Sequence, residues 1–315
     1  MVPDSSLTHS KRVVSGHGWL EQHKKHQSAK WKRIAYYFIR PMLKRYMRSK
    51  LVRHGYGHIP DYHILPEWGF PLEDRRRWAA RGVNIKDAVI LVCGTGWGWD
   101  VVGWAGLEPA KIIATDLFEC DTWDQVSAYC WDEMGVQVTF RQSPLENHAF
   151  VDSGSIDLTV SDAVYEHCCN LDAVMAETWR MLKKSGSVYA SYGPLWYTAG
   201  GDHFSGCDGL HTVYNHLLLE RGEYREYFNS LRKPGKGTLV ELDLFSRLAT
   251  SEYLSLFHRN GFRLDELIIE VSASALLFRE RYRKEFDKLQ TKYPFLDPLD
   301  FIIKTHLIRL KKRES

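Results

Sequence analysis

The sequence lacks any long apolar run. No apolar run in its 315 residues approaches the ~18 consecutive apolar residues that a membrane-spanning helix requires. The first dozen residues also lack the apolar centre of a secretory signal, so we expect a cytoplasmic protein. None of the six cysteines forms a CxxC pair, which favours free thiols in a reducing compartment over a disulfide framework.

Acidic residues are nearly absent from the N-terminal segment. Residues 1–60 carry 13 Lys and Arg against two acids, a formal charge of +11, whereas the remainder carries −8. The segment is therefore electrostatically distinct, although the net charge of the whole chain is only +3. The overall content of 44% hydrophobic and 26% charged residues is ordinary for a globular protein, and we find no internal repeat.

Within this segment, residues 28–53 place apolar side chains at helical spacing between Lys and Arg, which predicts an amphipathic helix that Pro41 should kink or divide. The helix could dock its apolar stripe on the main domain, lie on an anionic membrane surface, or face an acidic substrate. The acidic remainder and the missing recognition motifs argue against nucleic acid. We assign residues 1–71 to a basic extension, of which 54–71 form an aromatic linker or pocket wall.

From residue 72 onward, predicted strands and helices alternate as in a doubly wound, mostly parallel α/β sheet. Apolar runs predict seven strands, at 88–93, 111–115, 136–141, 155–161, 187–191, 263–271 and 301–310. Helices are expected at 72–82, 99–107, 122–134, 171–183 and 250–260, with a charged helical segment at 272–298. Residues 193–246 form a connection too long for an ordinary loop, which predicts a lid or substrate wall within a single domain, 72–315.

A glycine loop follows the first predicted strand. Residues 87–98 read DAVILVCGTGWG, and the glycines let the backbone approach a ligand closely. Asp116 lies 20 residues after Gly96, at the end of the second strand, where an acid can hold both hydroxyls of a ribose. The alternative role of the glycine loop is a purely structural turn, and that of Asp116 is the N-cap of the next helix. The dinucleotide pattern GxGxxG would need a glycine where Trp99 stands, so S-adenosylmethionine fits better than NAD.

Two stretches carry a family resemblance. The loop resembles the (D/E)xGxGxG loop of class I methyltransferases, with Val92 where many members have an acid. Residues 155–194 resemble the strand–helix–strand block of the methyltransferase type 11 (UbiE-like) group. The features that match are Ser161-Asp162, Glu166-His167, the stretch RMLKKSG from Arg180 to Gly186, with Ser185 in place of a glycine, and Pro194.

This resemblance implies a Rossmann-like methyltransferase fold that uses S-adenosylmethionine. It also implies which residues contact each part of the cofactor. These are Gly94, Gly96 and Trp97 at the amino-acid part, Asp116 and Leu117 at the ribose, Leu145 and Glu146 at the adenine, and Ser161, Asp162 and Tyr165 along the methionine side. Cys93, just before the loop, is a further candidate cofactor contact.

Transfer to an oxygen needs a base unless the acceptor is already ionised, and histidine is the best-placed residue type near neutral pH. His167, after the fourth strand, and His203, in the insertion, are the candidate catalytic residues. Each has a structural alternative, as a backbone-bonded residue or a turn histidine. The insertion also holds a loose group of metal-ligand types that matches no zinc spacing, so we expect no metal site. That group is His203, Cys207, Asp208, His211 and His216.

We therefore expect an S-adenosylmethionine-dependent enzyme that methylates oxygen on a small molecule or a glycan. An NAD-dependent reductase is one alternative, disfavoured by Trp99 and by the lack of a Tyr-x-x-x-Lys pair in a suitable place. The other is a non-catalytic methyltransferase-like subunit that binds a partner or membrane through its basic N-terminal helix. The acceptor and the oligomeric state do not follow from the sequence.

Overall fold

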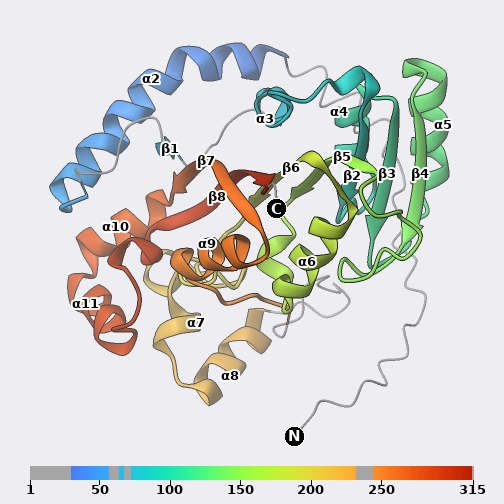
Figure 1. The fold of residues 1–315 in the computed structure, drawn as a ribbon. Helices are drawn as coiled ribbons and strands as arrows, with labels where there is room; N and C mark the ends of the chain where they lie inside the picture. The colour runs from blue at the N-terminus through green and yellow to red at the C-terminus, as the bar shows by residue number, and fades with distance from the viewer. Residues whose placement is uncertain (1–29, 57–63, 67–71, 232–243, 314–315) are drawn as a thin grey trace, which may run out of the picture.

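The computed structural model describes residues 30–56, 64–66, 72–231 and 244–313, and its central feature is an eight-stranded sheet (Figure 1). The strands are β1 (Ile64–Pro66), β2 (Val89–Cys93), β3 (Lys111–Asp116), β4 (Gln137–Gln142), β5 (Ile156–Asp162), β6 (Leu182–Tyr192), β7 (Phe262–Val271) and β8 (Ile303–Lys312). Their order is β1-β7-β8-β6-β5-β2-β3-β4. Only β8 runs antiparallel to its neighbours within this sheet. The predicted doubly wound, mostly parallel sheet is confirmed.

Helices cover both faces of the sheet, which explains the continuous apolar runs of its central strands. In β2, Leu91 packs into the core under α6 and α9, whereas Ile90 and Val92 face the core under α4 and α5. All three side chains are buried. The helices of this domain are α3 (Leu72–Ala79), α4 (Trp99–Ala105), α5 (Trp123–Met134), α6 (Leu171–Met181), α9 (Thr250–Arg259), α10 (Ala273–Arg281) and α11 (Arg283–Lys292).

The insertion after β6 is partly helical. Its described part contains α7 (Asn215–Leu218) and α8 (Arg221–Leu231), and Figure 1 shows both below the sheet. Short 3-10 turns occur at Ile85–Asp87, Tyr165–His167, Leu210–Thr212 and Pro298–Phe301. Residues 232–243 of the predicted lid, residues 57–63 and 67–71 of the predicted linker, and residues 1–29 lie outside the described residues.

The predicted linker also supplies a strand that the sequence pattern does not show. Ile64–Pro66 pairs in parallel with the end of β7 at Ile269–Val271. Three residues are too few to display a strand period, and β7 would otherwise be an edge with unpaired backbone groups. The described part of the linker therefore extends the sheet at the edge opposite β4.

Helix α2 (Lys30–Arg53) runs through Pro41 without being divided, and Figure 1 shows that it bends. Its apolar stripe does not dock as the simplest sequence interpretation expects. Met47 and Leu51 are buried, whereas Phe38 and Met42 are more than 70% exposed. Among the side chains of α2 that the structure describes, Met47 and Leu51 anchor the C-terminal part of the helix to the domain, together with an ion pair between Lys50 and Glu280.

Candidate active site

A cavity of about 490 Å³ lies at the carboxyl ends of β2, β3 and β5. The strand order reverses between β2 and β5, which is where open α/β sheets bind ligands. The volume falls within the usual range of small-molecule and cofactor sites. The lining residues are Gly94, Gly96, Trp97, Asp116, Leu117, Phe118, Cys120, Pro144, Leu145, Glu146, Ala163, Val164, His167, Cys168, Cys169 and Leu244.

The glycine loop forms one wall of this cavity. Gly94, Gly96 and Gly98 have φ values of 70°, 49° and 86°, a region that side-chain-bearing residues rarely adopt. A Cβ at Gly94 would lie 2.2 Å from Val164 Cγ2, whereas one at Gly96 would meet nothing within 4 Å. Both glycines line the cavity, so the loop is a close-fitting cradle that a side chain would obstruct.

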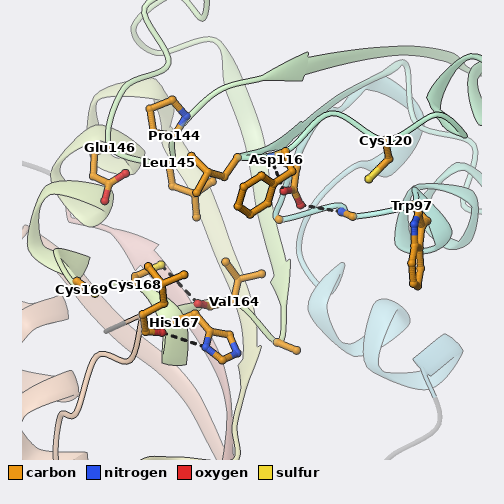
Figure 2. Close-up of a pocket in the computed structure, with 16 residues that line it drawn as sticks. Trp97, Asp116, Cys120, Pro144, Leu145, Glu146, Val164, His167, Cys168 and Cys169 are labelled. Atoms are coloured by element: carbon orange, nitrogen blue, oxygen red, sulfur yellow. Dashed lines mark hydrogen bonds between the residues drawn. The ribbon is translucent and has the colours of Figure 1, made fainter. Parts of the chain in front are cut away.

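Asp116 joins the end of β3 to this loop. Its Oδ2 accepts a hydrogen bond from the Gly96 N–H (2.8 Å), and its Oδ1 accepts one from the Phe118 N–H (3.0 Å). Figure 2 shows the carboxylate between Trp97 and the segment that carries Leu145. Burial raises the pKa of Asp116, and these backbone N–H groups oppose that rise. Each carboxylate oxygen keeps a second lone pair, so the group can both hold the loop and accept ribose hydroxyls.

The remaining walls come from three other segments. Leu145 and Glu146 line the cavity together with Pro144, and their contact with the adenine stays a prediction. Cys168 and Leu244 also line it and were not identified from the sequence. Leu244 follows the undescribed part of the insertion, and no motif marks it; only the packing of the insertion against β5 brings it here.

Four other predicted cofactor residues, Cys93 and the three expected along the methionine side, are placed differently. Cys93, Ser161 and Tyr165 are buried and do not line the cavity. Asp162 accepts a hydrogen bond from the Tyr189 hydroxyl (2.7 Å), and burial followed by the nearby Asp100 carboxyl raises its pKa to about 6. At this position the cavity wall is formed by the next residues, Ala163 and Val164, so the predicted contacts of the four residues stay predictions.

The two candidate histidines lie together at one edge of the cavity. The His167 and His203 rings have centroids 4.9 Å apart, although only His167 lines the cavity. His167 Nδ1 lies 3.1 Å from the Leu244 carbonyl oxygen. A carbonyl oxygen can only accept a hydrogen bond, so Nδ1 carries the hydrogen and donates it. Its Nε2 is then the proton-accepting atom. The neighbouring Asp202 does not orient the His203 ring through its described bonds, because its carboxylate accepts from Ser205 and Tyr224.

The pKa of each ring is lowered. His203 is exposed over part of its surface, and its pKa falls to about 4, first through lost hydration beside Phe245 and then through repulsion by His167. The pKa of His167 falls by burial, partly opposed by the Leu244 carbonyl. Both imidazoles are therefore neutral near pH 7, the state in which a histidine can accept a proton.

A buried carboxyl completes this group. Glu166 Oε1 accepts from the Gly193 N–H (3.0 Å), whereas Oε2 is buried with no hydrogen-bond partner among the described residues. Burial raises the pKa of Glu166 to about 8. One ligand atom from each of Glu166, His167 and His203 lies within 4.8 Å of the others, so these three described residues have the types and proximity to hold a metal ion. Of the metal-ligand types noted in the insertion from the sequence, only His203 belongs to this group of three described residues.

A comparison with protein families assigns the central part of the chain. Residues 91–190 match the family model described as a methyltransferase domain. This range begins in β2 and ends in β6, so it contains the glycine loop, Asp116 and the Glu166-His167 pair. No curated protein sequence matches the chain.

Several solved structures are similar to the chain at low identity. A Listeria monocytogenes protein assigned as an S-adenosylmethionine-dependent methyltransferase is 19% identical, with a TM-score of 0.49 over 79% of this chain and 97% of its own. Geranyl diphosphate C-methyltransferase from Streptomyces coelicolor is 12% identical, with a TM-score of 0.46 over 76% and 78%. The 1,6-didemethyltoxoflavin-N1-methyltransferase of Burkholderia thailandensis is 12% identical, with a TM-score of 0.45 over 77% and 78%. At these scores the fold assignment rests on the strand order itself.

Proposed function

We propose that this chain, which carries a class I methyltransferase domain at residues 91–190 and uses S-adenosylmethionine, methylates an oxygen atom of a small molecule or glycan. The cofactor supplies a methyl group on a sulfonium, which is a good leaving centre. The residues present fit this cofactor, because the cavity combines a side-chain-free loop at Gly94 and Gly96 with the carboxylate of Asp116. The chain's task is to hold the acceptor oxygen in line with the methyl group and exclude water.

The observation that favours oxygen is the histidine pair. His167 lies in the cavity wall with Nε2 available, and the ring of His203 lies beside it, tilted by 54°, from the insertion that we predict to be the substrate wall. A neutral imidazole at this place can take the proton that a hydroxyl loses on methylation. The neighbouring Glu166, with a pKa of about 8, is protonated at neutral pH and adds no negative charge to the pair.

The low pKa values narrow the kind of hydroxyl. A base is effective when its pKa lies close to that of the group it deprotonates, and a histidine with a pKa of about 4 is a weak one. We therefore propose an acceptor with an acidic hydroxyl, such as a phenol or an enol, ahead of an ordinary sugar hydroxyl. The proton of such a hydroxyl is lost more easily than that of a sugar hydroxyl, so a weak base can accept it.

Calorimetry with S-adenosylmethionine, followed by labelled methyl transfer to a panel of phenols, enols, carboxylic acids, glycans and amines, tests this function. We expect saturable cofactor binding and label on oxygen of an acidic hydroxyl. Absence of cofactor binding would refute the use of this cavity. Label found on nitrogen or carbon would refute the choice of oxygen while leaving the methyltransferase assignment intact.

Replacing His203 with asparagine should lower kcat/KM by about 10²- to 10⁴-fold, the usual contribution of a general base. Asparagine tolerates the φ of 67° at this position, and the change should leave cofactor affinity unaltered. His211→Asn, an exposed histidine of the same insertion, is the matched control and should have no effect. An equal loss in both variants would show that the insertion, and not the imidazole, is at fault.

The pH dependence provides a second test of the same pair. A base must be unprotonated to act, and a lowered pKa keeps it unprotonated in more acidic solution. The acid limb of kcat/KM should therefore lie below the ordinary histidine pKa of about 6.5, toward the value of about 4 at His203. A limb at or above pH 6.5 in the wild-type enzyme would contradict the roles given to both rings.

A further inference from the structure

Helix α2 turns an apolar face toward solvent. Large apolar side chains occur three or four residues apart along it, and side chains at this spacing share one face of a helix. They are between 46% and 78% exposed, and are Ile34, Phe38, Ile39 and Met42. We call them the outer face. A water-facing helix normally shows the opposite arrangement, with its apolar residues against the core.

The other side of α2 is the one that docks. Met47 and Leu51 are 4% and 0% exposed, and they lie about 140° and 180° around the helix axis from Met42. Lys50 donates to Glu280 of α10 at 2.6 Å. The C-terminal half is therefore anchored on the domain in an orientation that keeps the outer face away from it.

The charge of α2 is of one sign. Residues 30–53 contain nine Lys and Arg and no acid. Arg45 is exposed close to the outer face, at about 60° around the axis from Met42. A helix with an apolar face and basic flanks combines the two features that bind anionic bilayers, since the apolar side chains enter the acyl boundary while the basic ones meet the phosphates.

Other occupants fit this face less well. Pairing of two α2 helices across the outer face would bring like charges together, which is destabilising. Among the described helices none is long and apolar enough to cross a bilayer, so α2 can only lie along its surface. At 24 residues it would extend about 36 Å in that plane.

We infer that α2 is a membrane-surface helix that holds the protein on anionic lipid through its outer face. No described residue of α2 lines the cavity, so this attachment is separate from the cofactor site. In Figure 1, α2 lies at the periphery of the molecule, beside β1 and β7 and away from α7 and α8. The domain can therefore rest on a bilayer through α2 without the insertion being buried in it.

Sedimentation of the full chain with lipid vesicles tests this inference. At low salt, wild type should bind vesicles of phosphatidylcholine with about a third phosphatidylglycerol at least tenfold more tightly than vesicles of phosphatidylcholine alone. Binding should weaken as salt screens the attraction. The inference is overturned if wild type fails to bind the anionic vesicles, or binds both kinds equally.

Three variants separate the contributions. Phe38→Ser with Met42→Ser should weaken vesicle binding at least tenfold, and Arg45→Glu should weaken it in the same direction. Trp131→Ser is the matched control, because Trp131 is an apolar side chain 62% exposed on α5, and it should bind as wild type does. Wild-type binding by the Phe38 and Met42 variant would overturn the role of the outer face. A wild-type dimer that this variant abolishes would instead show an interface between copies.

Cofactor affinity distinguishes this inference from the proposed function. Every α2 variant should bind S-adenosylmethionine as wild type does, which also shows that it is folded. If wild type binds anionic vesicles but not the cofactor, the attachment stands and the proposed function fails. If wild type binds the cofactor but not anionic vesicles, the membrane attachment is refuted and the proposed function stands.

Discussion

Replacing Asp116 with alanine should weaken S-adenosylmethionine binding by about 100-fold or more. A hydrogen bond to a charged group contributes about 1.5–3 kcal/mol, and two ribose hydroxyls would each lose one. The carboxylate also accepts from the Gly96 and Phe118 N–H groups, so its loss loosens the glycine loop that forms the opposite wall. Calorimetry measures the combined effect.

A cofactor analogue separates the two roles of Asp116. S-adenosylhomocysteine and its dideoxyribose analogue should differ strongly in affinity for wild type and little for Asp116→Ala, because the variant has already lost the hydroxyl partner. Glu119→Ala removes an exposed acid three residues away and should bind both ligands as wild type does. Equal sensitivity of wild type and Asp116→Ala to the missing hydroxyls would refute ribose recognition by Asp116.

Alanine at Gly94 and at Gly96 should have contrasting effects. At Gly94 the new Cβ would overlap Val164 at a positive φ, so we expect the free energy of unfolding to fall by about 2–5 kcal/mol. At Gly96 the Cβ meets no protein atom, so stability should fall only by about 1–2 kcal/mol. That Cβ would instead stand in the cavity, and we expect the cofactor Kd of Gly96→Ala to rise at least tenfold.

Gly135→Ala measures how much stability is lost merely because alanine is placed at a positive φ. Gly135 has a φ of 68°, open space around its Cβ position and no place in the cavity. Urea unfolding of the three variants should rank Gly94→Ala as the least stable and show Gly96→Ala close to Gly135→Ala. Only Gly96→Ala should combine near-control stability with weak cofactor binding. Wild-type affinity in Gly96→Ala would show that the loop does not approach the cofactor.

The sequence is most informative where local patterns carry the structural signal. Short apolar runs predicted central strands such as β2 and β5, because strands buried on both faces have no polar alternation, whereas alternation predicted β8. The proximity of Gly96 and Asp116 was also predictable, because each follows or ends a strand of the parallel sheet. In a parallel sheet, neighbouring strands such as β2 and β3 end at the same edge, with Cys93 opposite Thr115.

Contacts that join distant segments were less predictable. No spacing rule connects His167 with Leu244 or with the ring of His203, since these meet only when the insertion folds back over the end of β5. Strand β1 depends in the same way on a partner far along the chain.

The sequence by itself determined strands β2 to β8, the glycine loop and the place of Asp116 beside it, because these depend on residue type and short-range spacing. Only the tertiary structure decided which face of α2 is buried. The apolar stripe of α2 predicts that some surface covers it, and periodicity cannot say which surface. The packing of Met47 and Leu51 on the domain, fixed by the Lys50 ion pair to Glu280, leaves Phe38 and Met42 facing outward.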